Sequence, residues 1–104
     1  AHLYLTNKNI IDLTHSIKVI PYQDIVWLYS YEIRQKGVKT ARSIILKRQN
    51  GKSLSVAYMA AIGKKNKDSY EEIFKTIVKN CPQALVGFNK ENETKYKKII
   101  KKSS

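Results

Sequence analysis

The stretch of this chain that most constrains its fold is residues 20–33, which holds the only tryptophan, Trp27. From residue 25 onward the side chains alternate between two faces, with Ile25, Trp27, Tyr29, Tyr31 and Ile33 on one and Val26, Leu28, Ser30, Glu32 and Arg34 on the other. This period of two predicts a central β-strand. Because aromatic side chains bury the largest areas, we expect Trp27 to be buried and the remaining elements to pack around this strand.

Shorter β-prone runs precede this strand, at residues 2–5, 10–13 and 17–20. The turn residues at 6–9 predict a hairpin between the first two runs. Pro21 lacks a backbone N–H and so predicts a corner over residues 21–24. Residues 35–39, which include Gly37 and two lysines, predict an exposed loop after the Trp27 strand.

A second hairpin is predicted at Asn50-Gly51, the preferred pair for a two-residue type I′ turn with positive φ at both positions. Strands at 43–48 and 53–59 flank this turn. Their inward residues at period two are Ile44, Leu46, Leu54, Val56 and Tyr58.

Two helices are expected in the last third of the chain. Ser69 and Glu72 form a capping-box pattern that predicts a helix start, and Pro82 ends this helix. One helical stripe contains Tyr70, Ile73, Phe74, Ile77, Val78 and Cys81, and we expect it to cover the aromatic face of the Trp27 strand. After a short buried return at residues 84–88, Asn89 caps a second helix whose inward residues are Tyr96, Ile99 and Ile100.

Catalytic and metal-binding patterns are scarce in this sequence. His15 falls in a predicted turn, and Cys81 occupies a buried position of the helical stripe, as a structural thiol would. Asp24 and Glu32 are too far apart on one strand to share a metal ion. There is no Cys-x-x-Cys motif, His-x-x-x-His motif or glycine-rich phosphate loop. We therefore expect no enzyme activity, no metal and no cofactor, and no small-molecule substrate is evident.

The net charge of +12 is the strongest compositional signal, and it favours partners that are polyanionic. Candidate contacts to an anionic surface are the cations of predicted loops and turns: Lys36, Lys39, Arg48, Lys52, Lys64, Lys65 and Lys67. The same residues would also serve solubility alone, and the sequence leaves both interpretations open. Nearly every tyrosine falls on an apolar face, which makes stacking on single-stranded nucleic acid the weaker interpretation.

Two segments carry a family resemblance. The Pro-Tyr-Gln-Asp-Ile-Val-Trp entry at residues 21–27 and the Pro-Gln-Ala-Leu-Val-Gly-Phe segment at 82–88 resemble bacterial pleckstrin-homology-like domains of uncharacterised, often membrane-tethered proteins. The similarity runs from about Leu3 to Tyr96. It implies a curved antiparallel sheet packed by a helix and a non-enzymatic role, and it assigns no binding residues.

We therefore predict an α+β fold, with a pleckstrin-homology-like antiparallel sheet, one packing helix and a second C-terminal helix. Residues 1–104 form one domain, which we expect to be a piece of a longer protein. The expected role is a binding or interaction module at the cytoplasmic face of a bacterial membrane. Its expected partner is an anionic membrane surface or another protein, and the alternative is a basic nucleic-acid-binding domain.

Overall fold

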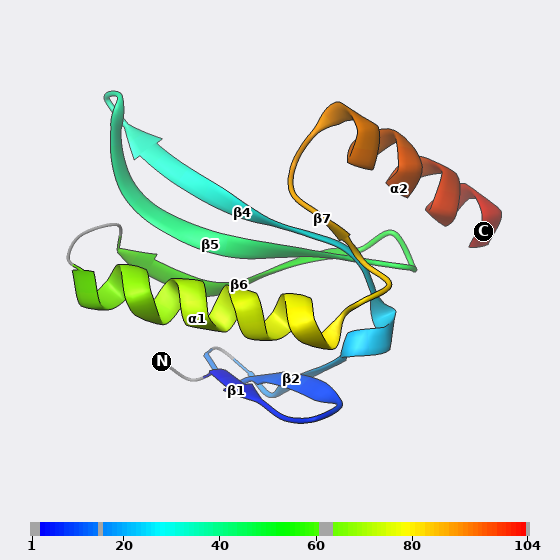
Figure 1. The fold of residues 1–104 in the computed structure, drawn as a ribbon, viewed down its shortest axis with the longest axis horizontal. Helices are drawn as coiled ribbons and strands as arrows, with labels where there is room; N and C mark the ends of the chain where they lie inside the picture. The colour runs from blue at the N-terminus through cyan, green and yellow to red at the C-terminus, as the bar shows by residue number, and fades with distance from the viewer. Residues whose placement is uncertain (1–2, 15, 61–63, 104) are drawn as a thin grey trace.

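The computed structural model describes residues 3–14, 16–60 and 64–103 as an α+β fold with two sheets and two helices (Figure 1). Strands β1 (Leu3–Leu5), β2 (Asn9–Asp12) and β3 (Lys18–Pro21) form a three-stranded antiparallel sheet. A single 3-10 turn, η1 (Tyr22–Asp24), leads from it into the large sheet. This arrangement confirms the predicted first hairpin and the corner at Pro21.

The large sheet has the strand order β6-β5-β4-β7. Strands β4 (Ile25–Gln35), β5 (Val38–Arg48) and β6 (Ser53–Ala60) are antiparallel, and the short β7 (Leu85–Val86) pairs in parallel with β4. Helix α1 (Lys64–Asn80) lies between the large and the small sheet in Figure 1. Helix α2 (Lys90–Ser103) lies beyond β7, apart from α1. The predicted central position of the Trp27 strand is confirmed.

Two separate apolar cores lie on the two faces of β4. The first core joins both sheets to α1, and its fully buried members include Ile10, Leu28, Ile44, Leu46 and Ile77. All of the predicted α1 stripe packs in this core. The second core consists of Trp27, Tyr29 and Tyr96, with Ile100 among the partly buried residues packed against it.

The prediction that the α1 stripe covers the aromatic face of β4 is therefore wrong. Trp27 is buried as expected, at 3% exposure, but α2 covers it. A register shift between Ile25 and Trp27 inserts Val26 as an extra residue, and Ile25 therefore packs in the first core with Leu28. The first core is lined by aliphatic side chains from three strands of the large sheet, and this broad surface matches the α1 stripe.

The two hairpin turns of the large sheet differ from the prediction. The two-residue turn lies at Lys36-Gly37, where φ is 52° and 81°, both positive as type I′ requires. At the predicted site the loop has three residues, because Gly51 N donates to Arg48 O (3.1 Å) and Arg48 N donates to Lys52 O (2.9 Å). Only Gly51 of that loop has a positive φ, 86°. The Asn-Gly pair thus supports a turn followed by a left-handed glycine.

Strand β6 contains a bulge at Ala57, which has a left-handed φ of 57°. The register passes from Ile44↔Val56 to Arg42↔Met59, and one residue of β5 therefore faces two of β6. Val56 is buried as predicted, but the bulge turns Tyr58 outward to 69% exposure. The prediction that Tyr58 faces inward is wrong for this reason.

Helix α1 begins at Lys64, ahead of the predicted capping box at Ser69. Residues 64–68 contain neither glycine nor proline, the residue types that interrupt a helix most strongly, and the helix extends through them despite three lysines. The prediction that Lys64, Lys65 and Lys67 lie in a loop is therefore wrong. The second helix is confirmed, and Asn89 caps it as expected, since its Oδ1 accepts a hydrogen bond from Asn92 N (2.8 Å).

The Lys36-Gly37 turn yields a stability prediction. Lys36→Asn should raise the free energy of unfolding by about 0.5–1 kcal/mol, because asparagine tolerates the left-handed conformation better than lysine. Urea denaturation would measure the change. Lys52→Asn is the matched control, since it alters charge identically at an exposed residue of the other hairpin, and a similar gain there would contradict the conformational explanation.

The second core, around Trp27, yields a second stability prediction. Trp27→Ala should lower the free energy of unfolding by about 3–5 kcal/mol. In a double-mutant cycle, Trp27→Phe and Ile100→Ala should show a coupling free energy of about 0.5 kcal/mol or more, because both side chains belong to the second core. Trp27→Phe and Phe74→Ala should be additive, and coupling to Phe74 instead would contradict the two-core arrangement.

Candidate functional site

The segment after α1 reaches the edge of β4 and leaves it almost at once. Strand β7 pairs with β4 only at Trp27↔Leu85 and Leu28↔Val86. Gly87 N then donates to Leu28 O (2.9 Å), and Gly87 turns the chain away with a φ of 101° that favours glycine.

Three side-chain hydrogen bonds fix this segment in place. Trp27 Nε1 donates to Gly87 O (2.8 Å), which gives the buried indole its partner. Asn92 Nδ2 donates to Val86 O (3.0 Å) and to Gly87 O (2.9 Å). The start of α2 and the core of the sheet therefore both hold the backbone directly before Phe88.

Phe88 is a rigidly held side chain that is largely exposed. Its ring stacks on Trp27 at a centroid distance of 5.9 Å and an interplanar angle of 13°, and it meets Tyr29 edge-on at 5.0 Å and 61°. Phe88 nevertheless remains 65% exposed, and Tyr31 of β4 is 52% exposed. Large apolar side chains that are exposed together and fixed in position are typical of binding surfaces.

Two adjacent hollows share Tyr29 and Phe88, and together we call them the aromatic groove. The first, of about 280 Å³, lies toward α2 and is lined by Trp27, Tyr29, Lys47, Phe88, Glu93, Tyr96, Lys97 and Ile100. The second, of about 350 Å³, lies along β4 and is lined by Tyr29, Ser30, Tyr31, Glu32 and Phe88. The groove thus runs from α2 to the outer half of β4.

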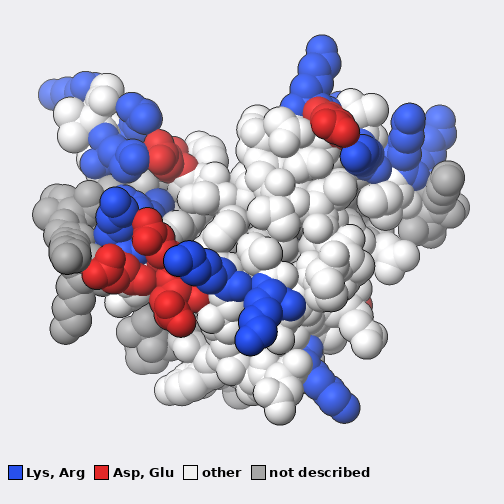
Figure 2. Space-filling model, in the orientation of Figure 1, with Lys and Arg blue, Asp and Glu red and all other residues white. Residues whose placement is uncertain are grey.

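Charges in the lining of the groove balance. Glu93 pairs with Lys97 at 3.1 Å, and Glu32 pairs with Lys39 at 2.8 Å and with Arg34 at 3.2 Å. The hydrogen bond from Lys39 is the main cause that lowers the pKa of Glu32, which therefore stays ionised. Burial raises the pKa of the Tyr29 phenol, which stays neutral. Figure 2 shows a broad uncharged surface between basic groups on the β4–β5 hairpin and on α2.

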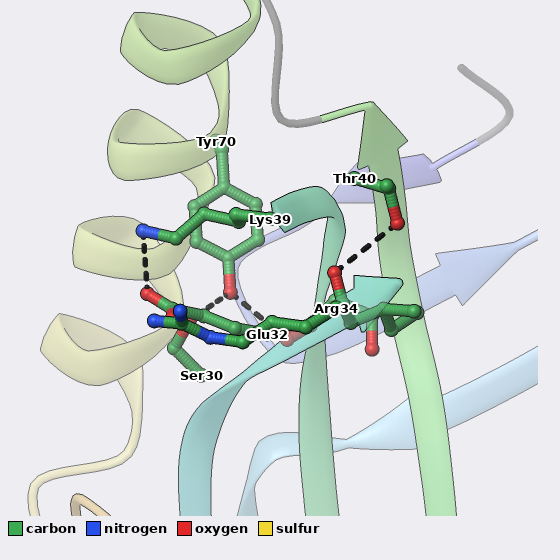
Figure 3. Close-up of polar contacts among 8 residues, drawn as sticks. Ser30, Glu32, Arg34, Lys39, Thr40 and Tyr70 are labelled. Carbon is green, nitrogen blue, oxygen red and sulfur yellow. Dashed lines mark hydrogen bonds and ion pairs between the residues drawn. The ribbon is translucent and has the colours of Figure 1, made fainter. Parts of the chain in front are cut away.

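The face of β4 toward α1 carries a polar cluster that anchors this strand to the helix (Figure 3). Tyr70 Oη donates to Ser43 O (2.9 Å). Because its only hydrogen is used there, the hydroxyl of Ser30 donates to Tyr70 Oη in their mutual bond. Arg42 lies 5.3 Å from the centre of the Tyr70 ring, a cation–π distance. This cluster fixes the outer half of β4 from the side of α1, and its Ser30 also borders the hollow along β4.

The predicted cationic residues divide between two ends of the large sheet. Lys36 and Lys39 lie in the β4–β5 hairpin, and Lys67 lies in the first turns of α1 near the same end. Arg48 and Lys52 lie at the opposite end, where Arg48 pairs with Asp24 at 3.1 Å. The backbones of Lys64 and Lys65 belong to α1, and their side chains lie outside the described residues. The set does not gather on one surface.

Cys81, which was weighed for catalysis, has the surroundings of a structural thiol. It is 1% exposed, and burial raises the pKa of its thiol to about 11. His15 lies outside the described residues. Among the residues that are described, no cluster of His, Cys, Asp and Glu could hold a metal ion, and no helix is long and apolar enough to span a membrane.

The exposed aromatics are the residues that sequence reasoning missed. Phe88 was expected in a buried return and Tyr31 on a covered face, but Tyr4, Tyr31 and Tyr58 are all more than half exposed. The usable signal was Gly87, since a glycine after two strand residues indicates that the chain leaves the sheet and carries the next side chain outward.

The fold and the groove define a small α+β domain with an exposed aromatic groove. The domain of unknown function DUF6709 matches residues 9–96, and the chain belongs to this family. A search of curated proteins found no relative.

The buried thiol gives a chemical prediction. At pH 8, Cys81 of the folded protein should react with a disulfide reagent such as DTNB about 100-fold or more slowly than in guanidinium chloride, because reaction requires opening of the core. Fast labelling of the folded protein would contradict the described burial.

The same group makes stability depend on pH. Its pKa is raised from 9.0 to about 11 on folding, so between these values the unfolded chain loses this proton and the folded chain keeps it. The stability that the neutral Cys81 thiol contributes to the folded state is therefore complete below pH 9 and is lost as the pH rises toward 11. Cys81→Ala should show a shallower decline in unfolding free energy over this range.

Proposed function

We propose that this domain is a non-enzymatic interaction module that binds a segment of another protein in the aromatic groove. The observation that supports the proposal most strongly is Phe88, which is fixed by Trp27 and Tyr29 and yet 65% exposed. A rigid aromatic side chain loses little conformational entropy when it binds, and such residues carry much of the energy of protein interfaces.

The lining of the groove favours a protein segment over a polyanion. Lys47 and Lys97 are offset there by Glu32 and Glu93, so the groove offers no positive track for a phosphate backbone. An anionic membrane would need a single basic surface, whereas the candidate cations lie at two ends of the sheet. Apolar contact with aromatic rings is the interaction that the groove offers in abundance.

We further propose a pleckstrin-homology-like classification and a location at the cytoplasmic face of a membrane. Two largely antiparallel sheets that enclose a core closed by α1 support the first, together with the resemblance of residues 21–27 and 82–88. The net charge of +12 supports the second, because the cytoplasmic leaflet is negatively charged. In this location the groove would be free to bind a protein partner.

The proposal predicts how groove variants bind a defined probe. We choose the fluorescein-labelled peptide acetyl-Glu-Glu-Val-Ser-Ile-Ser-Val-Glu-Glu-amide and measure anisotropy. Phe88→Ala should weaken binding about tenfold or more, because the anchor ring is lost. Tyr58→Ala should have no more than about a twofold effect. It is the matched control, since Tyr58 is a similarly exposed aromatic (69%) on β6.

Two other probes test the competing interpretations. One is a labelled single strand of sixteen thymidines, and the other is vesicles of phosphatidylcholine with phosphatidylglycerol at 3:1. If Phe88→Ala leaves peptide binding unchanged, or if the peptide does not bind, the proposal is wrong. If the oligonucleotide binds more tightly than the peptide at 0.15 M salt and Phe88→Ala abolishes that binding, the nucleic-acid alternative replaces it. Binding to the vesicles alone would instead support the anionic membrane surface.

A further inference from the structure

We infer that the partner binds by strand addition: an extended peptide with an apolar centre and acidic ends pairs with the open edge of β4 and places alternate side chains in the aromatic groove. This inference rests on the proposed function and specifies the geometry and chemistry of the bound segment.

The edge of β4 is open because β7 is short. β7 covers β4 only at Trp27 and Leu28, whereas β4 continues to Gln35. In the described part of the chain, no strand pairs with residues 29–35 on this side. Figure 1 shows the outer half of β4 extending past β7 toward the β4–β5 hairpin. An unpaired strand edge is a ready template for another extended chain.

Backbone alternation identifies the groups on this edge. The carbonyl of Leu28 faces β7, since it accepts the hydrogen bond from Gly87 N. Because N–H and C=O groups of successive residues point to opposite sides of a strand, those of Ser30, Glu32 and Arg34 face the same open edge. The groups of Tyr29, Tyr31 and Ile33 face β5 instead.

The open edge is already ordered for binding. Ser30 is held by Tyr70, and Glu32 is held by Lys39 and Arg34, all on the face toward α1. These contacts keep β4 extended without occupying its edge. Little ordering entropy remains to oppose the addition of a strand.

The hollow along β4 explains why this edge is favoured over the outer edge of β6. Tyr31 and Phe88 border the β4 edge and line that hollow, so every second side chain of an added strand would contact them. Strand β6 is interrupted by the left-handed Ala57, and such a bulge hinders continuous pairing.

Two cations flank the groove along the large sheet. Lys47 lines the hollow toward α2, and Lys36 lies in the β4–β5 turn, beyond Glu32 of the hollow along β4. Among the described residues, neither forms an ion pair. Glu32 and Glu93, which line the groove, are already paired with Lys39 and Lys97. Charge complementarity therefore calls for an uncharged, apolar centre with acidic residues at both ends.

The test uses the nonapeptide above and two N-methylated versions of it. One version carries N-methyl groups on both valines and on isoleucine, and the other carries them on both serines. Each removes N–H donors from one edge of the extended peptide and leaves the other edge intact. We expect one version to lose binding about tenfold or more and the other to keep it, because only one edge pairs with β4.

Amide hydrogen exchange, measured by NMR, locates the hydrogen bonds that the protein backbone forms with the peptide. With the peptide at 100 times its Kd, exchange at the Ser30 and Glu32 amides should slow about 100-fold, because only the free state exchanges. The Tyr29 and Tyr31 amides should change little, since they already face β5.

The outcomes separate the inference from the proposed function. If Phe88→Ala abolishes binding but both N-methylated peptides bind equally, or if Ser30 and Glu32 gain no protection, the groove is the site and strand addition is wrong. If both N-methylated peptides lose binding equally, strand addition by one edge is also wrong. If sedimentation shows a dimer whose Ser30 and Glu32 amides are protected without peptide, the occupant is a second copy of the chain and the inference fails.

Discussion

The hydrogen bond from the Trp27 indole to the Gly87 carbonyl is the contact on which the last part of this fold, β7 and α2, depends. A buried indole N–H needs an acceptor, and this one lies on the segment that links the large sheet to α2. The bond sets the orientation of the ring, on which Phe88 then stacks and against which Tyr96 packs. One side chain of β4 thereby positions β7, the exposed aromatic residue and the last helix.

The two faces of β4 perform different tasks for this reason. Leu28 on one face packs with the small sheet and α1 in the larger core. Trp27 and Tyr29 on the other face are covered by α2 and the segment before it, and this cover ends short of Tyr31 and Phe88, which stay exposed. The larger core therefore stabilises the fold, and the smaller one supports the groove. A stable, fixed surface next to an incomplete core is what a preformed binding site requires.

Period-two and helical patterns were sufficient to predict most of the strands, the α1 stripe and the cap of α2, because these depend on local sequence and on one buried face, but β5 begins at Val38, inside the predicted loop at residues 35–39. The errors arose where a single extra residue changes which face is buried. Val26 and the left-handed Ala57 each shift the strand register, and neither valine nor alanine is a residue type that indicates a bulge. Which helix covers Trp27 depends on contacts 60 and more residues apart, such as its bond to Gly87, and no local pattern contains that information.

The exposed groove could not be predicted for the same reason, since an aromatic residue on a strand face indicates burial unless the covering element is known to be short. Here β7 stops at Val86 because Gly87 and the cap at Asn89 begin α2 directly. A longer β7 would have paired with the rest of β4 and covered Tyr31. The early turn instead leaves backbone groups and aromatic rings open side by side. Native proteins usually protect such edges, and the proposed partner strand would cover this one beside Phe88.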